Sequence, residues 1–156
     1  IAIAVAANCP GARIYAIDLS ADALAVARQN VEHLDANQQV ILLLGDLLAP
    51  LPEKVDIIVA NLPYISSDVF PELMLDVREF EPQLALESGP AGLDAITRLL
   101  QQAGAYLLPG GVILLEIGHD QGALVEQLAR NLLPTAHNIR VRQDYHGQDR
   151  LVTITL

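Results

Sequence analysis

The feature that most constrains the fold of this 156-residue chain is a regular alternation of short β-type runs with amphipathic helical patterns. After most of the apolar, β-branched runs comes a stretch in which apolar residues recur every three or four positions, the period of a helix. No low-complexity linker or internal repeat interrupts the pattern. Because strands that alternate with helices form a parallel sheet, the sequence predicts one α/β domain over residues 1–156.

The predicted strands are short and end at loops. They cover residues 13–18, 40–44, 55–60, 112–117, 139–145 and 150–156. The last two alternate apolar and polar residues around a polar turn, which predicts an antiparallel hairpin at the edge of the sheet. Residues 1–7 read as the remainder of a helix from a longer chain, and residues 65–90 read as irregular.

Three further helices are predicted. One is capped by Ser20 and aligns four residues on one face, and a second ends at Pro109-Gly110-Gly111. The third spans residues 121–132. The aligned residues are Leu24, Ala27, Val31 and Leu34 in the first helix and Leu124, Leu128 and Leu132 in the last.

The charge of the chain limits its partners. Nine basic and nineteen acidic residues give a net charge of -10, which opposes non-specific binding to a phosphate backbone and leaves no basic patch for a membrane surface. No apolar stretch reaches the ~20 residues that cross a bilayer. Cys9, the only cysteine, cannot form an internal disulfide, and the four histidines show no metal-ligand spacing. We therefore expect a cytoplasmic protein without a metal site, a membrane interaction or direct nucleic-acid binding.

Polar residues stand where three of the predicted strands end. They are Asp18, Asp46 and Asn61. Ligands of an open parallel sheet bind outside the carboxyl ends of its strands. A carboxylate at Asp18 can accept hydrogen bonds from both ribose hydroxyls of an adenosine-containing cofactor, and Asp46 can accept from an adenine amino group. Both aspartates can instead cap their strands, and Asp18 alone does not distinguish a nicotinamide dinucleotide from S-adenosylmethionine.

The tetrapeptide Asn61-Leu62-Pro63-Tyr64 follows the apolar run 55–60 and predicts a methyl-transfer site. The Asn61 side-chain oxygen and the Leu62 carbonyl can accept both hydrogens of a planar NH2 group. Pro63 fixes its own φ and favours an extended Leu62, while the Tyr64 ring can cover the face of the bound group. The alternative is an ordinary proline-containing turn after a strand.

Taken in order, a series of short motifs resembles the HemK/PrmC family. The motifs are Asp18-Leu19-Ser20 with Asn30, Gly45-Asp46-Leu47-Leu48, Asn61-Leu62-Pro63-Tyr64-Ile65, Glu81-Pro82 with Ala85-Leu86, Gly92-Leu93-Asp94, Pro109-Gly110-Gly111, Glu116-Ile117-Gly118 with Gln121, and Asp149-Arg150. The resemblance implies a Rossmann-like class I methyltransferase that moves a methyl group from S-adenosylmethionine to the side-chain amide nitrogen of a glutamine in peptide-chain release factors. It implies catalytic roles for Asn61, Leu62, Pro63 and Tyr64, and cofactor contacts from Asp18, Leu19, Asp46, Leu47 and Asn61.

The chain departs from the family pattern in two ways. Leu62 replaces the first proline of a Pro-Pro pair, which makes the motif look also like that of ribosomal-RNA adenine dimethyltransferases. The family's first strand, its Gly-rich cofactor loop and its helical amino-terminal domain would all precede Ile1. Two other functions therefore stay open: a nucleic-acid adenine-N6 methyltransferase, and a non-catalytic Rossmann-like binding domain.

Overall fold

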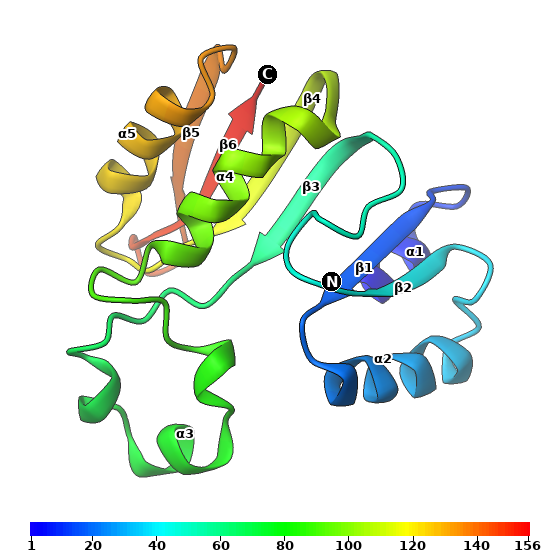
Figure 1. Ribbon diagram of the computed structural model, residues 1–156, viewed down its shortest axis with the longest axis horizontal. Helices are drawn as coiled ribbons and strands as arrows, with labels where there is room; N and C mark the ends of the chain where they lie inside the picture. Colours follow the sequence, from blue (N-terminus) through cyan, green and yellow to red (C-terminus); the bar gives the residue numbers. More distant parts are fainter. The chain divides into compact units, whose positions relative to one another are not determined.

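The computed structural model describes residues 1–156 and divides them into two compact units, residues 1–53 and residues 54–156 (Figure 1). Each unit contains a β-sheet of its own. Together the elements form a mixed α/β structure with the parallel pairs and the antiparallel hairpin that the sequence predicts.

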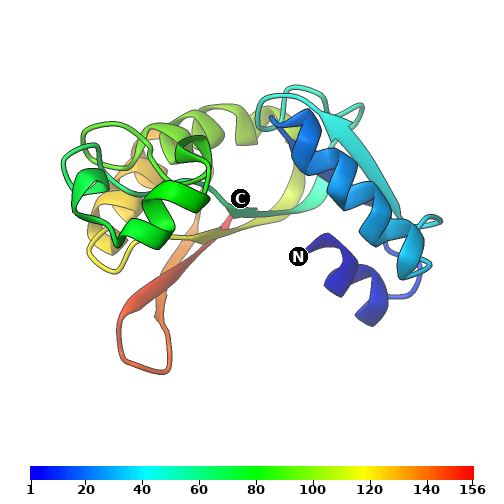
Figure 2. The same cartoon turned by 90° about the horizontal axis from the view of Figure 1, so that it is seen from below.

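The first unit consists of two parallel strands and two helices. The helices are α1 (Ala2–Asn8) and α2 (Ala21–His33), and the strands are β1 (Ile14–Asp18) and β2 (Val40–Leu44). The unit's small core joins Ala6 of α1 and Val31 of α2 to Val40 of β2, so both helices cover the same face of the strand pair (Figure 2).

Ser20 begins α2 as the sequence predicts. Its hydroxyl oxygen accepts a hydrogen bond from the Ala23 amide at 3.2 Å, and this satisfies one of the free N–H groups of the first turn. The predicted apolar face is correct for Leu24 and Val31 but wrong for Leu34, which is 58% exposed. The helix ends at His33, before Leu34 could join this face, and Ala36 is buried in the core in its place.

The second unit contains a four-stranded sheet. Its strands are β3 (Val55–Asn61), β4 (Leu107–Glu116), β5 (Asn138–Gln143) and β6 (Asp149–Thr155), in the order β3-β4-β6-β5. The pair β3–β4 is parallel, whereas β6 runs antiparallel to both of its neighbours. The predicted edge hairpin is therefore confirmed, with β5 as the edge strand.

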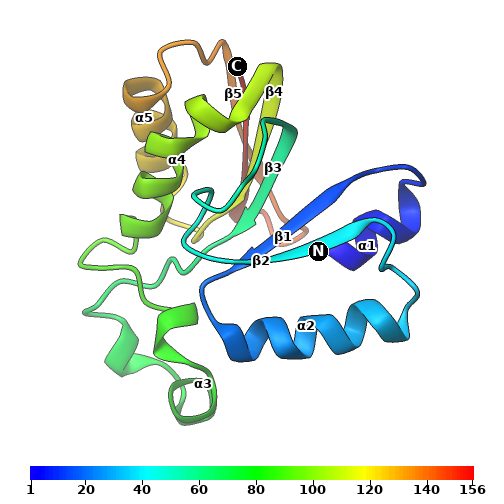
Figure 3. The same cartoon turned by 45° about the vertical axis from the view of Figure 1, so that its right-hand side comes forward.

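Two helices, α4 (Asp94–Tyr106) and α5 (Gly122–Leu132), cover one face of this sheet (Figure 3). The fully buried side chains include Ile96, Leu99, Leu100, Ile113, Leu115, Val125, Val152 and Ile154. The α4 helix ends three residues before Pro109, because Leu107 already pairs with Val55 as the first residue of β4. None of the chain's helices is both long enough and apolar enough to span a lipid bilayer.

The predicted face of α5 is wrong. Val125 and Ala129 are fully buried, whereas Leu124 is 49% exposed. The helix begins very close to the hairpin of β5 and β6, which leaves little room there for a larger side chain. A Cβ atom on Gly122 would come within 3.1 Å of the Val141 side chain and closer still to the Asp149 carboxylate.

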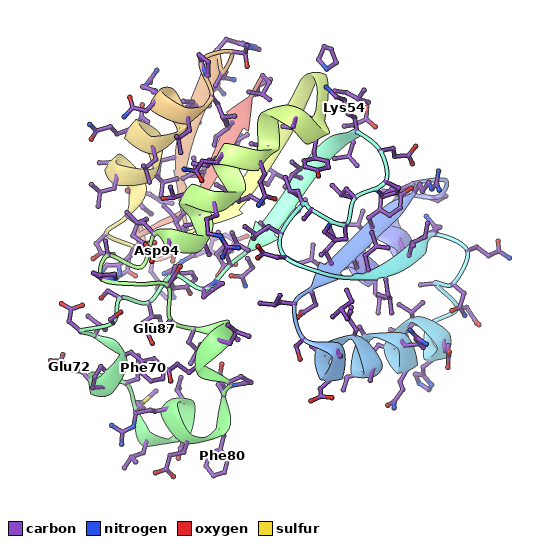
Figure 4. All side chains as sticks on the ribbon, viewed as in Figure 1. Lys54, Phe70, Glu72, Phe80, Glu87 and Asp94 are labelled. Atoms are coloured by element: carbon purple, nitrogen blue, oxygen red, sulfur yellow. The ribbon has the colours of Figure 1, made fainter.

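The segment between β3 and α4, predicted as irregular, contains one short helix and two single turns. These are η1 (Phe70–Glu72), α3 (Leu75–Phe80) and η2 (Gln83–Ala85). Figure 4 shows Phe80 at the outer end of this segment, where it is 81% exposed. Both ends of the segment are tied together, because the Ile65 amide donates to the Leu86 carbonyl at 2.9 Å and the Ser88 amide donates to the Ile65 carbonyl at 2.9 Å.

Candidate functional site

In the first unit, Asp18 and Asp46 lie at the carboxyl ends of neighbouring parallel strands. Asp18 is the last residue of β1 and is in register with Leu44, the last residue of β2. Beyond the strands, the Gly45 amide donates a hydrogen bond to the Asp18 carbonyl at 3.0 Å. This bond brings the start of the Gly45–Leu48 loop next to the end of β1, at the edge of the sheet where ligands bind in parallel α/β folds.

The two carboxylate oxygens of Asp18 have different surroundings. Oδ1 accepts a hydrogen bond from the Ser20 amide at 2.8 Å and so fixes the turn into α2. Oδ2 accepts no hydrogen bond from the protein, and the residue is exposed. Capping and ligand binding use different oxygens here, so both interpretations of Asp18 fit the same geometry.

The loop after β2 has a strained backbone. Leu47 has a φ of 51°, in the left-handed region that non-glycine residues rarely occupy. The preceding Gly45 lies so close to Pro50 that a Cβ atom would approach the proline ring to 2.9 Å. Such strain persists only where the surrounding structure enforces it, and it is frequent at binding sites. Leu19, on the neighbouring strand end, is 53% exposed and adds an apolar surface to this edge.

In the second unit, Asn61 is the last residue of β3 and is in register with Glu116 at the end of β4. Its side chain is exposed, and its carboxamide forms no hydrogen bond with the protein. The Leu62 carbonyl likewise accepts no hydrogen bond from a protein group. An ordinary turn asparagine bonds to nearby backbone groups. Asn61 does not, so its side chain is available to a ligand.

The chain just after this pair of acceptors is held from several directions. Ile65 forms a parallel β-bridge with Glu87, and the Ser67 amide donates to the Gly89 carbonyl at 3.0 Å. The side chain of Gln121 donates to the Tyr64 carbonyl at 3.0 Å. The tetrapeptide therefore combines a fixed backbone with free polar groups at Asn61 and Leu62.

Gly92 lies against this loop, whereas the side chain of Ser88 supports the start of α4. Gly92 has a φ of 67°, and a Cβ atom there would lie 2.1 Å from the Tyr64 carbonyl oxygen, so only glycine fits. Ser88 is buried, and its hydroxyl oxygen accepts from the Ala95 amide at 2.8 Å, which caps the start of α4. It is a structural serine.

Charged groups around the loop are ordinary surface carboxylates. Hydrogen bonds from the Ser67 hydroxyl, at 2.5 Å, and from the Gln83 amide hold the pKa of Glu87 below its usual range, so this carboxylate stays ionised beside the loop. No group of three or more histidine, cysteine, aspartate or glutamate residues is placed to hold a metal ion.

The structure groups the residues singled out in the sequence into two sets. Asp18, Leu19, Asp46 and Leu47 gather at the strand ends of the first unit, and residues 61–64 form one loop of the second. Sequence reasoning gave no role to Gln121, which is 5% exposed. The Gly118 amide donates a hydrogen bond to Gln121 Oε1 at 2.9 Å. A glutamine directly before an apolar helix was the available signal.

Known proteins share much of this sequence. The model of the methyltransferase small domain matches residues 1–74. A release factor glutamine methyltransferase of Moorella thermoacetica is 49% identical over 96% of this chain and 53% of its own length, and one of Cereibacter sphaeroides is 42% identical over 100% and 55%. A ribosomal protein uL3 glutamine methyltransferase of Burkholderia pseudomallei is 38% identical over 78% of this chain and 42% of its own length.

Solved structures confirm the methyltransferase fold. TrmN from Thermus thermophilus superimposes with a TM-score of 0.63 and 22% identity, covering 99% of this chain and 40% of TrmN. At that identity the similarity concerns the fold alone. The chain spans about half the length of the curated relatives it matches. From the sequence identities, the chain belongs to the HemK/PrmC family of glutamine methyltransferases.

Proposed function

We propose that this chain is the catalytic domain, residues 1–156, of an enzyme that transfers a methyl group from S-adenosylmethionine to the side-chain amide nitrogen of a glutamine in a peptide-chain release factor. The observation that carries the proposal is the loop after β3. Its backbone is fixed by Gln121 and by the bridge at Ile65, while the carboxamide of Asn61 and the carbonyl of Leu62 remain free. The names of the relatives support the choice of acceptor.

The acceptor chemistry explains why these groups are needed. An amide nitrogen is a poor nucleophile because its lone pair is delocalised into the carbonyl. Rate enhancement then comes mainly from orientation. Asn61 Oδ1 and the Leu62 carbonyl each accept one N–H of the glutamine NH2 group, which directs the lone pair toward the methyl donor. Tyr64 packs on the amide plane. Asn61 is neutral and acts without a proton transfer of its own.

The first unit offers groups that fit S-adenosylmethionine. The free Oδ2 of Asp18 suits a ribose hydroxyl, and the exposed Leu19 and the strained Leu47 lie at the same sheet edge as apolar surface for the adenine ring. Asp46 would contact the adenine amino group. When bound, S-adenosylmethionine supplies an electrophilic methyl group on a sulfonium sulfur.

A nucleic-acid adenine-N6 methyltransferase would present a similar planar NH2 group to Asn61. The net charge of -10 argues against that acceptor, because binding to a phosphate backbone relies on basic side chains. Relatives that are 42% and 49% identical are named for release factors, and one that is 38% identical is named for ribosomal protein uL3. We therefore place the reaction on a translation protein in the cytoplasm.

Asn61→Ala in the complete enzyme tests the proposal. Affinity for S-adenosylmethionine should remain nearly unchanged, while methyl transfer falls by ~100-fold or more, the scale expected when a positioning contact is lost. Asn131→Ala, which removes an exposed asparagine from α5, is the matched control and should behave like the wild type. Calorimetry measures the affinity, and single-turnover assays measure the transfer.

The acceptor is identified by offering tritiated S-adenosylmethionine together with a release factor and an adenine-containing oligonucleotide. Label should appear on a glutamine of the release factor. Label on adenine alone would overturn the protein acceptor but leave the role of Asn61 intact. Absence of label from both, with the cofactor bound, would contradict the proposed acceptor class.

A further inference from the structure

Gln121 is one of only two buried polar side chains in the chain, and its amide connects three separate segments. Nε2 donates to the carbonyls of Tyr64 at 3.0 Å, Ala91 at 3.2 Å and Gly92 at 3.3 Å. Oε1 accepts from the Gly118 amide at 2.9 Å. Two N–H groups thus serve three carbonyls, and every polar atom of the side chain is used within the protein.

A primary amide is the only neutral side-chain group that provides two donors and an acceptor at one point. The Gln121 amide donates to the carbonyls of Tyr64, Ala91 and Gly92 in place of the backbone N–H groups that a neighbouring strand would provide. A buried amide that lost these partners would leave unpaired polar groups in the interior, which is strongly unfavourable. Both polar atoms of the Gln121 side chain therefore form hydrogen bonds with backbone groups, and neither is free to bind a ligand.

The held carbonyl of Tyr64 lies two residues beyond Leu62. On the other side, Asn61 is fixed by its pairing with Glu116 in the β3–β4 ladder. Between these two anchors, Pro63 has a fixed φ and restricts Leu62 to extended conformations. Few backbone torsions remain between Asn61 and Tyr64. With both ends fixed, the direction of the Leu62 carbonyl is set as well.

We infer that Gln121 is a positioning residue for methyl transfer: through the Tyr64 carbonyl it sets the orientation of the two acceptors that bind the substrate amide. The inference rests on the proposed function. Gln121 acts through the loop backbone, so it should influence the turnover of the bound acceptor and leave the affinity for S-adenosylmethionine unaffected. A purely structural role would instead change turnover only in proportion to lost stability.

The test is Gln121→Glu in the complete enzyme. Glutamate has the same size and keeps an acceptor for Gly118, but its carboxylate has no N–H and faces three carbonyl oxygens. We expect kcat to fall by ~10- to 100-fold, as for a displacement of about 1 Å at a positioning group. Affinity for S-adenosylmethionine should stay within twofold. Hydrogen exchange at the Ile65 amide, measured by NMR, should become faster.

Two controls separate this effect from general damage. Gln127→Glu makes the same chemical change at an exposed position of α5 and should match the wild type in every measurement. Ser88→Ala removes the other buried polar side chain, which caps α4, and should lower the melting temperature without lowering kcat. If Gln121→Glu does not fold, Gln121→Asn provides an uncharged amide that is too short to reach Tyr64.

The inference is wrong if the Gln121 variant keeps the wild-type kcat, if its Ile65 exchange is unchanged, or if Ser88→Ala lowers kcat as much at equal loss of stability. Transfer of label to adenine instead of glutamine would contradict the proposed function, and the same comparison of kcat would then be made on adenine. Transfer to neither acceptor would overturn the proposed function and this inference together, whereas an effect confined to the cofactor affinity would overturn this inference alone.

Discussion

Asp18 shows how one residue can satisfy the fold and still be available to a ligand. Its Oδ1 holds the Ser20 amide, and its Oδ2 has no protein partner. Replacement by asparagine keeps an oxygen for Ser20 but removes the charge. Replacement by alanine removes both functions.

We predict that Asp18→Asn lowers the affinity for S-adenosylmethionine by tenfold or more, about 1.4 kcal/mol, because a charge-assisted contact to ribose becomes a neutral one. The free energy of unfolding should change little. Asp18→Ala should lower both quantities. Calorimetry and urea unfolding measure them, and unchanged affinity in both variants would show that Asp18 is only a cap.

At the scale of elements, two glycines with positive φ permit a direct comparison. Gly92 and Gly110 have similar backbone conformations, with φ of 67° and 78°. A Cβ atom at Gly110 would meet nothing within 4 Å, whereas one at Gly92 would collide with the Tyr64 carbonyl. The two sites therefore share the conformational cost of substitution and differ in packing against the proposed acceptor loop.

Gly110→Ala should destabilise the protein by ~1 to 2 kcal/mol, the cost of a left-handed conformation for alanine. Gly92→Ala should destabilise it by more than about 3 kcal/mol, because backbone must also move. Urea unfolding provides both values. Equal losses would mean that the loop at Tyr64 yields easily and is less rigid than its hydrogen bonds indicate.

The structure confirms some of the strands, caps and helix faces predicted from the sequence and contradicts others. The cap at Ser20 and the presence of each strand follow from local chemistry, and the structure confirms them, although β4 begins at Leu107 and not at residue 112. The buried face of α5 cannot be predicted in the same way, because Leu124 and Val125 each belong to an apolar stripe of the helix. The close approach of Gly122 to the hairpin, which the sequence does not reveal, selects the stripe that contains Val125. The predicted ligand contacts of residues 61–64 stay a prediction. Their support by Gln121 was not predicted, since local sequence patterns do not show that it joins residues 57 positions apart.

For the whole molecule, three carboxylates of the second unit connect stability to pH. The Ser66 hydroxyl lowers the pKa of Asp68, the Ser67 hydroxyl and Gln83 amide lower that of Glu87, and the Gln148 amide lowers that of Asp144. Each group releases its proton more easily when folded. The stability they contribute is therefore fully present above their ordinary pKa values of 3.8 and 4.5, and it is lost as the pH falls through the lowered values.

We predict that these groups make the free energy of unfolding of the complete protein neither rise nor fall between pH 7 and about 5, where their contribution is complete, and that it declines on further acidification. Asp144→Asn should make the decline less steep, since that site no longer binds a proton on unfolding. Urea titrations at successive pH values test this. An identical slope in the variant would show that the hydrogen bond from Gln148 does not favour the ionised form.

The connection between Gln121 and Tyr64 also bears on the order in which the chain folds. Contacts between distant residues form late, because the loop between them must first be closed at the expense of chain entropy. The hairpin of β5 and β6 needs only a short turn, with Gln143 opposite Asp149. The parallel ladder of β3 and β4, and the amide that bridges Tyr64 to α5, close a loop of more than fifty residues. We therefore expect the loop at Asn61 to be among the last parts to reach its native form, so that a nascent or partly folded chain should lack the geometry of the proposed acceptor site until the rest of the second unit is complete.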